Sequence, residues 1–141
     1  MIQKVFLDTN VIIDLMIERE PFAEEAKEIF ATKDDYNYDI IVSALTIANL
    51  AYVIDRLNKK PHEIIAALLP LVSIVDLSAS TIAETIVSVF KDFEDGLQHF
   101  SALAAKADVI VTRNEKDFKH SLIPVMSPRE FLDLFKSGDT D

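Results

Sequence analysis

Carboxylate and amide side chains border apolar segments at widely separated places in this sequence. Asp8 directly follows a short apolar run, and Asn114 follows another. Asp92 and Asp95 precede an apolar pattern with helical spacing. Carboxylates that share one cleft repel one another unless they are protonated or bridged by a cation. Oxygen ligands of this kind select Mg²⁺ or Mn²⁺, so these side chains would form a divalent metal site if the fold brings them together.

Short apolar segments alternate with helical patterns along the chain, and this alternation decides where the polar residues lie. Strands are predicted at residues 2–7, 39–42, 73–77, 108–112 and 123–126. Helices are predicted from residue 21, from Ser43 to 57, over 61–69, around 82–90, around 97–107, and from Ser127. The pattern indicates an α/β fold with a parallel sheet covered by helices on both faces. Ligands bind such sheets beyond the carboxyl ends of the strands, where Asp8, Asp95 and Asn114 are expected to converge.

The composition limits the class of protein. The chain has 141 residues, of which 50% are hydrophobic, and this is enough to bury the core of one domain. We expect a single domain over residues 1–136, followed by a polar tail at 137–141. The net charge of −10 argues against binding of nucleic acid through a broad basic surface, because such binding depends on neutralising phosphates.

Several features of the chain indicate its cellular setting. Cysteine is absent, which excludes disulfides and thiolate catalysis. No apolar run approaches the roughly 20 residues needed to span a membrane. The N-terminus lacks the basic start and small-residue cleavage site of a signal peptide. We therefore expect a cytoplasmic protein.

Each of the candidate side chains also has an ordinary structural explanation. Asp8 could simply end a strand, and Asn10 could bond to its own backbone in a turn. Asp92 and Asp95 have the spacing of a helix N-cap and the third residue of that helix. His99 follows Asp95 by one helical turn, which favours a pair of side chains on the surface. Only the joint arrangement favours a functional site over these explanations.

Four segments of the chain form a set in a fixed order: FLDTNVIID, SALTIANLAYVI, DFEDGLQHFSALAAKADVIVTRNEKDF and SPREFL. Together they resemble the PIN domain, in particular its single-domain bacterial branch that includes VapC-like toxins, and they span nearly the whole chain. The resemblance implies a three-layer PIN-like fold with a five-stranded parallel sheet of order 3-2-1-4-5. It also implies a metal-dependent endoribonuclease that hydrolyses RNA, with Mg²⁺ or Mn²⁺ as cofactor.

The resemblance also implies partners. A VapC-like ribonuclease is the toxin of a toxin–antitoxin pair, so we expect a cognate antitoxin in addition to the RNA substrate. A basic segment of the antitoxin would match the net charge of −10. A homodimer is expected, and a membrane is not.

The family pattern assigns roles to individual residues. Its first acid corresponds to Asp8, its third to Asp95, and its fourth position to Asn114, with Asp117 near it. Asn49 stands at the second position, where the general pattern has a glutamate. An amide oxygen can coordinate Mg²⁺ but adds no charge, so metal affinity and activity should be reduced. Asp8 and Asp95 are therefore the predicted metal ligands, and Asn49 and Asn114 are weaker ligands or groups that orient the carboxylates.

Other polar side chains are expected to support this site. The residues predicted to bond to the carboxylates or to add charge are Thr9, Asn10, Ser43, Asp92, Glu94, Thr112 and Asp117. The basic residues predicted as candidates for contacts with RNA phosphates are Arg19, Arg113, Lys116 and Lys119.

Three other classes of protein remain open. A PIN-like binding module without catalysis would be distinguished by Asn49. A phosphoacceptor receiver also has an aspartate at a strand end, but it needs an acid pair after the first strand and a lysine after the last. A haloacid-dehalogenase-like hydrolase needs a second acid two residues after Asp8, where Asn10 stands. The last two classes fit the sequence less well.

Overall fold

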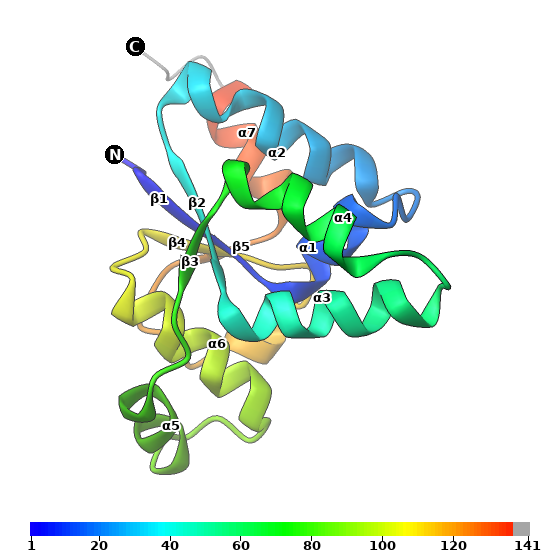
Figure 1. The fold of residues 1–141 in the computed structure, drawn as a ribbon. Coiled ribbons are helices and arrows are strands. Elements are labelled where there is room, and N and C mark those ends of the chain that lie inside the picture. The colour runs from blue at the N-terminus through cyan, green and yellow to red at the C-terminus, as the bar shows by residue number, and fades with distance from the viewer. Residues whose placement is uncertain (137–141) are drawn as a thin grey trace.

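The strands form a parallel sheet in the order β3-β2-β1-β4-β5 (Figure 1). The structure is a computed structural model that describes residues 1–136, so the polar tail expected at 137–141 lies outside the described residues. The strands are β1 (Lys4–Leu7), β2 (Asp39–Ser43), β3 (Ser73–Val75), β4 (Val109–Val111) and β5 (Val125–Met126). The predicted α/β class, the parallel sheet and its strand order are confirmed.

Helices cover both faces of this sheet (Figure 1). One face carries α1 (Thr9–Met16), α2 (Ala23–Tyr36), α3 (Ala44–Arg56), α4 (Pro61–Leu68) and α7 (Pro128–Lys136). The other face carries α6 (Phe93–Ala104), against which α5 (Ala79–Ile86) packs. Two short 3₁₀ helices are η1 (Leu69–Leu71) and η2 (Glu115–Phe118). None of the helices within residues 1–136 is long and apolar enough to cross a membrane.

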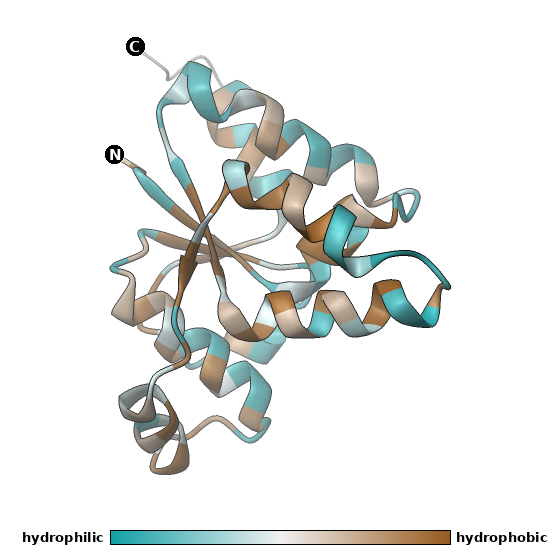
Figure 2. Cartoon of the chain, viewed as in Figure 1, coloured by the Kyte–Doolittle hydropathy of each residue, from teal (hydrophilic) through white to brown (hydrophobic). Residues whose placement is uncertain are grey.

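The central strand β1 explains why the sheet is stable between two helical layers. Val5 and Leu7 belong to the core under α1, α2, α3, α4 and α7, whereas Phe6 belongs to the core under α6. All three side chains are fully buried. Burial of such a side chain contributes roughly 1.5–3 kcal/mol relative to exposure, so consecutive apolar residues hold the strand from both sides. Figure 2 shows hydrophobic residues concentrated along the strands.

The strand register brings the carboxyl ends of three neighbouring strands to one edge of the sheet. Leu7 of β1 lies opposite Val111 of β4, and the backbone N–H of Asp8 donates to the carbonyl oxygen of Val111 at 3.0 Å. On the other side of β1, strand β2 ends at Ser43. Asp8, Ser43 and Thr112 therefore start from the same edge, as the sequence predicts for Asp8 and Thr112.

Two helices differ from the sequence prediction. Residues 9–16 form α1, which the sequence pattern does not predict, because this short segment contains β-branched residues that favour strands as much as helices. The helix α5 ends at Ile86, whereas the apolar spacing predicts a helix to about residue 90. Ile86 and Val89 are 68% and 67% exposed, so their spacing does not mark a buried helix face.

Candidate active site

Asp8 lies at the end of β1 and forms the N-cap of α1. One carboxylate oxygen, Oδ1, accepts hydrogen bonds from the backbone N–H of Thr9 at 2.9 Å and from Gln98 Nε2 at 3.2 Å. The other oxygen, Oδ2, accepts from the hydroxyl of Thr112 at 2.7 Å. Burial raises the pKa of Asp8 in spite of these bonds, and the negative charge of Asp117 raises it further. The fold therefore holds this carboxylate in a fixed orientation where its charge is costly.

Gln98 of α6 connects Asp8 to the surrounding elements. Its Nε2 atom lies 2.9 Å from the hydroxyls of both Thr9 and Thr46, and its Oε1 atom accepts a hydrogen bond from Ser43. Ser43 caps α3 by accepting from the backbone N–H of Thr46 at 3.0 Å. This buried network joins β1, β2, α3 and α6 around one carboxylate.

Gln98 is not among the site residues predicted from the sequence. A signal was available, because Gln98 follows Asp95 by three residues and the two share one face of α6. Among the predicted supporting residues, Asn10 Nδ2 lies 3.5 Å from Asp8 Oδ2 and 3.4 Å from the Thr112 hydroxyl. Ser43 is connected to Asp8 through Gln98 and does not bond to the carboxylate within the described residues.

Asp95 lies in the first turn of α6, and its carboxyl group is near several other acids. Asp92 is the N-cap of this helix and accepts from the backbone N–H of Asp95 at 2.9 Å. The pKa of Asp95 is raised to about 7, first by burial and then by the charges of Asp92, Asp117, Asp8 and Glu94. Acids from β1, α6 and η2 therefore influence one another across this edge of the sheet.

Asn49 of α3 contacts an acid of α6. Its Nδ2 atom donates to Glu94 Oε1 at 2.6 Å. The position where the family pattern has a glutamate therefore has a carboxylate beside it, supplied by a different helix.

Asp8, Asp92, Glu94, Asp95 and Asp117 are called the acid cluster below. Of the two predicted site residues after β4, Asp117 belongs to this cluster and Asn114 does not. Asn114 is exposed, and its side chain makes no hydrogen bond to any residue within 1–136. Asp117, on η2, is the residue after β4 whose charge raises the pKa values of both Asp8 and Asp95.

The two predicted phosphate-binding arginines are engaged by a buried acid instead. Arg113 donates to Asp14 through Nε at 2.6 Å and through Nη2 at 3.2 Å, and its guanidinium lies 3.9 Å from the centre of the Phe22 ring. Arg19 Nε is 3.8 Å from the same carboxylate. Because Asp14 is only 1% exposed, the bidentate pair with Arg113 compensates a buried charge. Lys116 and Lys119 remain exposed.

The predicted surface pair between His99 and Asp95 is wrong. His99 is 1% exposed and packs against Phe90, with 4.7 Å between the ring centres. Its Nε2 atom accepts from the backbone N–H of Leu122 at 3.1 Å, and burial lowers its pKa. The residue is a neutral part of the packing between α6 and the segment before β5.

The chemistry of this donor set fits a divalent cation. Its members are carboxylate and amide oxygens, and the charges of the neighbouring acids add to the effect of burial in raising the pKa of Asp95. Within residues 1–136, however, no three acidic or histidine side chains stand close enough together to hold a metal ion without moving. Exposed side chains such as Glu94 and Asp117 would have to rotate toward Asp8 and Asp95.

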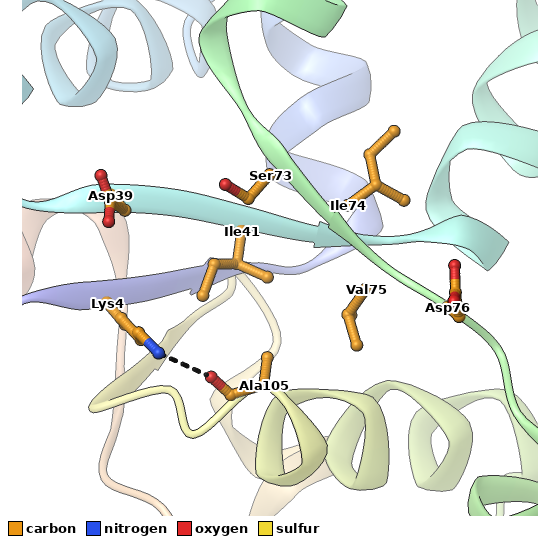
Figure 3. Close-up of a pocket in the computed structure, with 8 residues that line it drawn as sticks. All are labelled: Lys4, Asp39, Ile41, Ser73, Ile74, Val75, Asp76 and Ala105. Atoms are coloured by element: carbon orange, nitrogen blue, oxygen red, sulfur yellow. Dashed lines mark hydrogen bonds between the residues drawn. The ribbon is translucent and has the colours of Figure 1, made fainter.

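Cavity size does not identify this site. A cavity of about 400 Å³ lies beside β2 and β3 (Figure 3). It is lined by Lys4, Asp39, Ile41, Ser73, Ile74, Val75, Asp76 and Ala105. None of the predicted site residues is among them. A smaller cleft, of about 170 Å³, contains Asp95, Asp92 and Asp117.

Comparisons with known proteins agree with the fold. A sequence model of the PIN domain matches residues 4–116. Ribonuclease VapC1 of Aquifex aeolicus (strain VF5) is 27% identical over 141 residues, which cover 96% of this chain and 97% of that protein.

Two solved toxin–antitoxin structures share the architecture. VapBC2 from Rickettsia felis, bound to a DNA fragment from their promoter, has a TM-score of 0.65 at 20% identity and covers 89% of this chain and 98% of that chain. A toxin–antitoxin complex from Klebsiella pneumoniae has a TM-score of 0.65 at 24% identity and covers 88% and 97%. These likenesses show a common fold.

We predict that Asp95→Asn stabilises the metal-free protein at pH 8. The folded-state pKa of Asp95 is about 7 against a usual value of 3.8, so the folded protein binds more protons between these values. The stability of the wild type should therefore fall as pH rises through this window and stay low above it. The variant should lack this fall, and its melting temperature in EDTA should exceed that of the wild type at pH 8 but not at pH 4. Asp55→Asn, an exposed acid on α3, is the control. A melting temperature of Asp95→Asn below that of the wild type at pH 8 would contradict the clustering of acids.

Proposed function

The chain belongs to the PIN domain family, and from this premise we propose that it is a divalent-metal-dependent endoribonuclease and the toxin of a toxin–antitoxin pair. The observation that carries the proposal is the convergence of Asp8, Asp95 and Asp117 from three separate elements, where the charge of Asp117 raises the pKa values of Asp8 and Asp95 and the charge of Asp8 adds to that of Asp95. A relative named as a ribonuclease, matched over nearly the whole chain, supports the reaction class.

Asp8 and Asp95 are the proposed metal ligands, with Asp117 and Glu94 adding negative charge. The donor atoms are oxygens, which suit both Mg²⁺ and Mn²⁺, so the proposal covers either ion. A bound divalent cation would lower the pKa of a water molecule and neutralise charge that develops on the phosphate.

The protein's own residues orient these ligands. The hydroxyl of Thr112, the backbone N–H of Thr9 and the Gln98 amide fix both oxygens of Asp8, so that its remaining lone pairs have a defined direction. Asp92 fixes the start of α6 and with it the position of Asp95. Hydrogen-bonded partners of this kind typically change metal affinity or activity by about 10–100-fold.

Asn49 supports a second candidate function. A PIN domain with an amide at this position could bind a partner without cleaving RNA. The contact between Asn49 and Glu94 favours the enzyme, because it keeps a carboxylate beside that position. We propose that Glu94 restores part of the missing charge.

The proposed partners follow from charge and exposure. An antitoxin with a basic segment suits a chain of net charge −10, and relatives by fold are known as toxin–antitoxin complexes. A homodimer would cover the apolar residues Ile86, Val87 and Val89, which are 68%, 84% and 67% exposed. We propose one PIN domain over residues 1–136, acting in the cytoplasm.

We predict that the purified protein cleaves RNA with Mn²⁺ or Mg²⁺ and not with EDTA. Because Asp95 is a proposed ligand, Asp95→Asn should reduce the cleavage rate by at least about 100-fold. Asp55→Asn should cleave at the wild-type rate. Gel electrophoresis of a mixture of structured RNAs measures cleavage by the wild type and by the two variants. Cleavage that persists in EDTA, or that survives in Asp95→Asn, would refute the proposal.

A second prediction concerns the amide at position 49. Asn49→Glu replaces the donor that contacts Glu94 with a second carboxylate, so the metal-free protein should melt at a lower temperature. The added charge should also tighten Mn²⁺ binding by up to about tenfold, which corresponds to about 1.4 kcal/mol. Calorimetric titration with Mn²⁺ and melting curves in EDTA measure the two effects. Ala48→Glu adds the same charge at the adjacent exposed position. This control should neither lower the melting temperature nor tighten Mn²⁺ binding. Unchanged Mn²⁺ affinity in Asn49→Glu would place this residue outside the metal site.

A further inference from the structure

A cleft beside the acid cluster is lined by basic side chains. Its volume is about 170 Å³, and its polar lining consists of Lys91, Lys116, Lys119 and His120 together with three acids, Asp92, Asp95 and Asp117. These basic groups come from the segment before α6 and from η2 and the residues that follow it. The cleft thus places positive charge next to two of the acids that form the proposed active site.

The three lysines of this cleft are available for a ligand. All three are exposed, and none forms an ion pair with any acid in residues 1–136, although Asp95 and Asp117 line the same cleft. Many other cations of the chain are engaged: those paired with acids are Arg19, Lys27, Lys33, Arg113, Arg129 and Lys136. In a chain of net charge −10, a local group of unpaired lysines is a site for anions.

We propose that this cleft holds the sugar–phosphate backbone of single-stranded RNA, with Lys91, Lys116 and Lys119 contacting successive phosphates. This inference rests on the proposed function and specifies how its substrate reaches Asp95. A small cleft in which three lysines lack ion pairs suits one strand, because proteins bind single-stranded nucleic acid through positive groups that follow the backbone. The three lysines would take over the phosphate contacts predicted for Arg113, because Arg113 is paired with Asp14.

An exposed aromatic residue that directly follows a cleft residue in the sequence favours a nucleic acid over another anion. Phe93, the first residue of α6, is 49% exposed and follows Asp92, which lines the cleft. Stacking of a base on such a ring contributes about 1–3 kcal/mol without sequence preference. A purely acidic peptide would bind the lysines but would not use the ring.

The carboxylates of the cleft fix where the RNA is acted upon. Asp95 and Asp117 repel a phosphate unless a cation lies between them, and phosphate oxygens are ligands that Mg²⁺ prefers. The lysines therefore bind phosphates on the approach to the acids, whereas the phosphate at the acids is held only in the presence of the metal.

The test measures RNA binding without cleavage. A fluorescein-labelled single-stranded RNA of mixed sequence is titrated with protein in EDTA, and its anisotropy is recorded at several salt concentrations. The triple variant Lys91→Gln, Lys116→Gln, Lys119→Gln should bind at least tenfold more weakly at low salt. Its plot of log affinity against log salt should be shallower by about 2, because each contact to a single strand contributes about 0.7.

A matched control removes the same number of positive charges elsewhere. Lys59, Lys60 and Lys106 are also exposed and make no ion pair within residues 1–136, so their triple replacement by glutamine gives the same net charge. This control should bind RNA with the wild-type salt slope. Both variants should keep the wild-type melting temperature, because the replaced side chains are on the surface.

The outcomes separate this inference from the proposed function. If both triple variants lose affinity equally, general charge explains the binding and the cleft is not the RNA site. If the wild type cleaves RNA with Mn²⁺ but the cleft variant binds RNA as tightly as the wild type does, the inference is wrong and the proposed function stands. A wild type that neither binds nor cleaves RNA contradicts both. Loss of binding by the cleft variant alone, with unchanged Mn²⁺ affinity, supports the inference.

Discussion

The constraint on which the rest of the site depends is the burial of the Asp8 carboxylate at the carboxyl end of β1. Burial raises the pKa of this group, and hydrogen bonds from donors in three directions oppose that rise. Thr112 follows β4, Gln98 lies on α6, and the N–H of Thr9 belongs to α1. Each donor is positioned by a neighbour of β1 in the fold. The hydrogen bonds that compensate the burial of Asp8 therefore also hold the strand ends, α1 and α6 in fixed positions relative to one another.

Some charged side chains at this edge of the sheet form ion pairs within the fold, whereas others remain available to bind a cation. Asp14 is buried and pairs with Arg113, so removing Arg113 would leave this buried carboxylate with the longer contact of 3.8 Å to Arg19. Within residues 1–136 no cation forms an ion pair with Asp95 or Asp117, and the charge of Asp117 contributes to the raised pKa of Asp95. A site of this kind stores unfavourable electrostatic energy that a cation would relieve. The fold tolerates it because Asp117 is exposed and Asp95 is only partly buried.

The sequence was sufficient for the architecture and for the acids that lie at strand and helix ends. Apolar runs identify β1, and the hydrogen bonds between Ser127 and Glu130 confirm the helix start predicted from their spacing. The remaining differences arise from contacts between residues far apart in the chain. Neither the pairing of Asn49 with Glu94 nor that of Arg113 with Asp14 leaves a local pattern, because periodicity reports the face of an element and not the partner it meets. His99 was misplaced for the same reason, since the spacing to Asp95 says nothing of the segment near Leu122 that covers it.

The central claim is that Asp8 and Asp95 together bind one divalent cation. The most direct measurement is the anomalous diffraction of crystals grown with Mn²⁺, because it locates the ion without reference to activity. We expect an anomalous peak within bonding distance of carboxylate oxygens of both Asp8 and Asp95, with Asp117 or Glu94 turned toward it. A map with Mn²⁺ bound elsewhere, or with no ion between these two carboxylates at a saturating concentration, would contradict it.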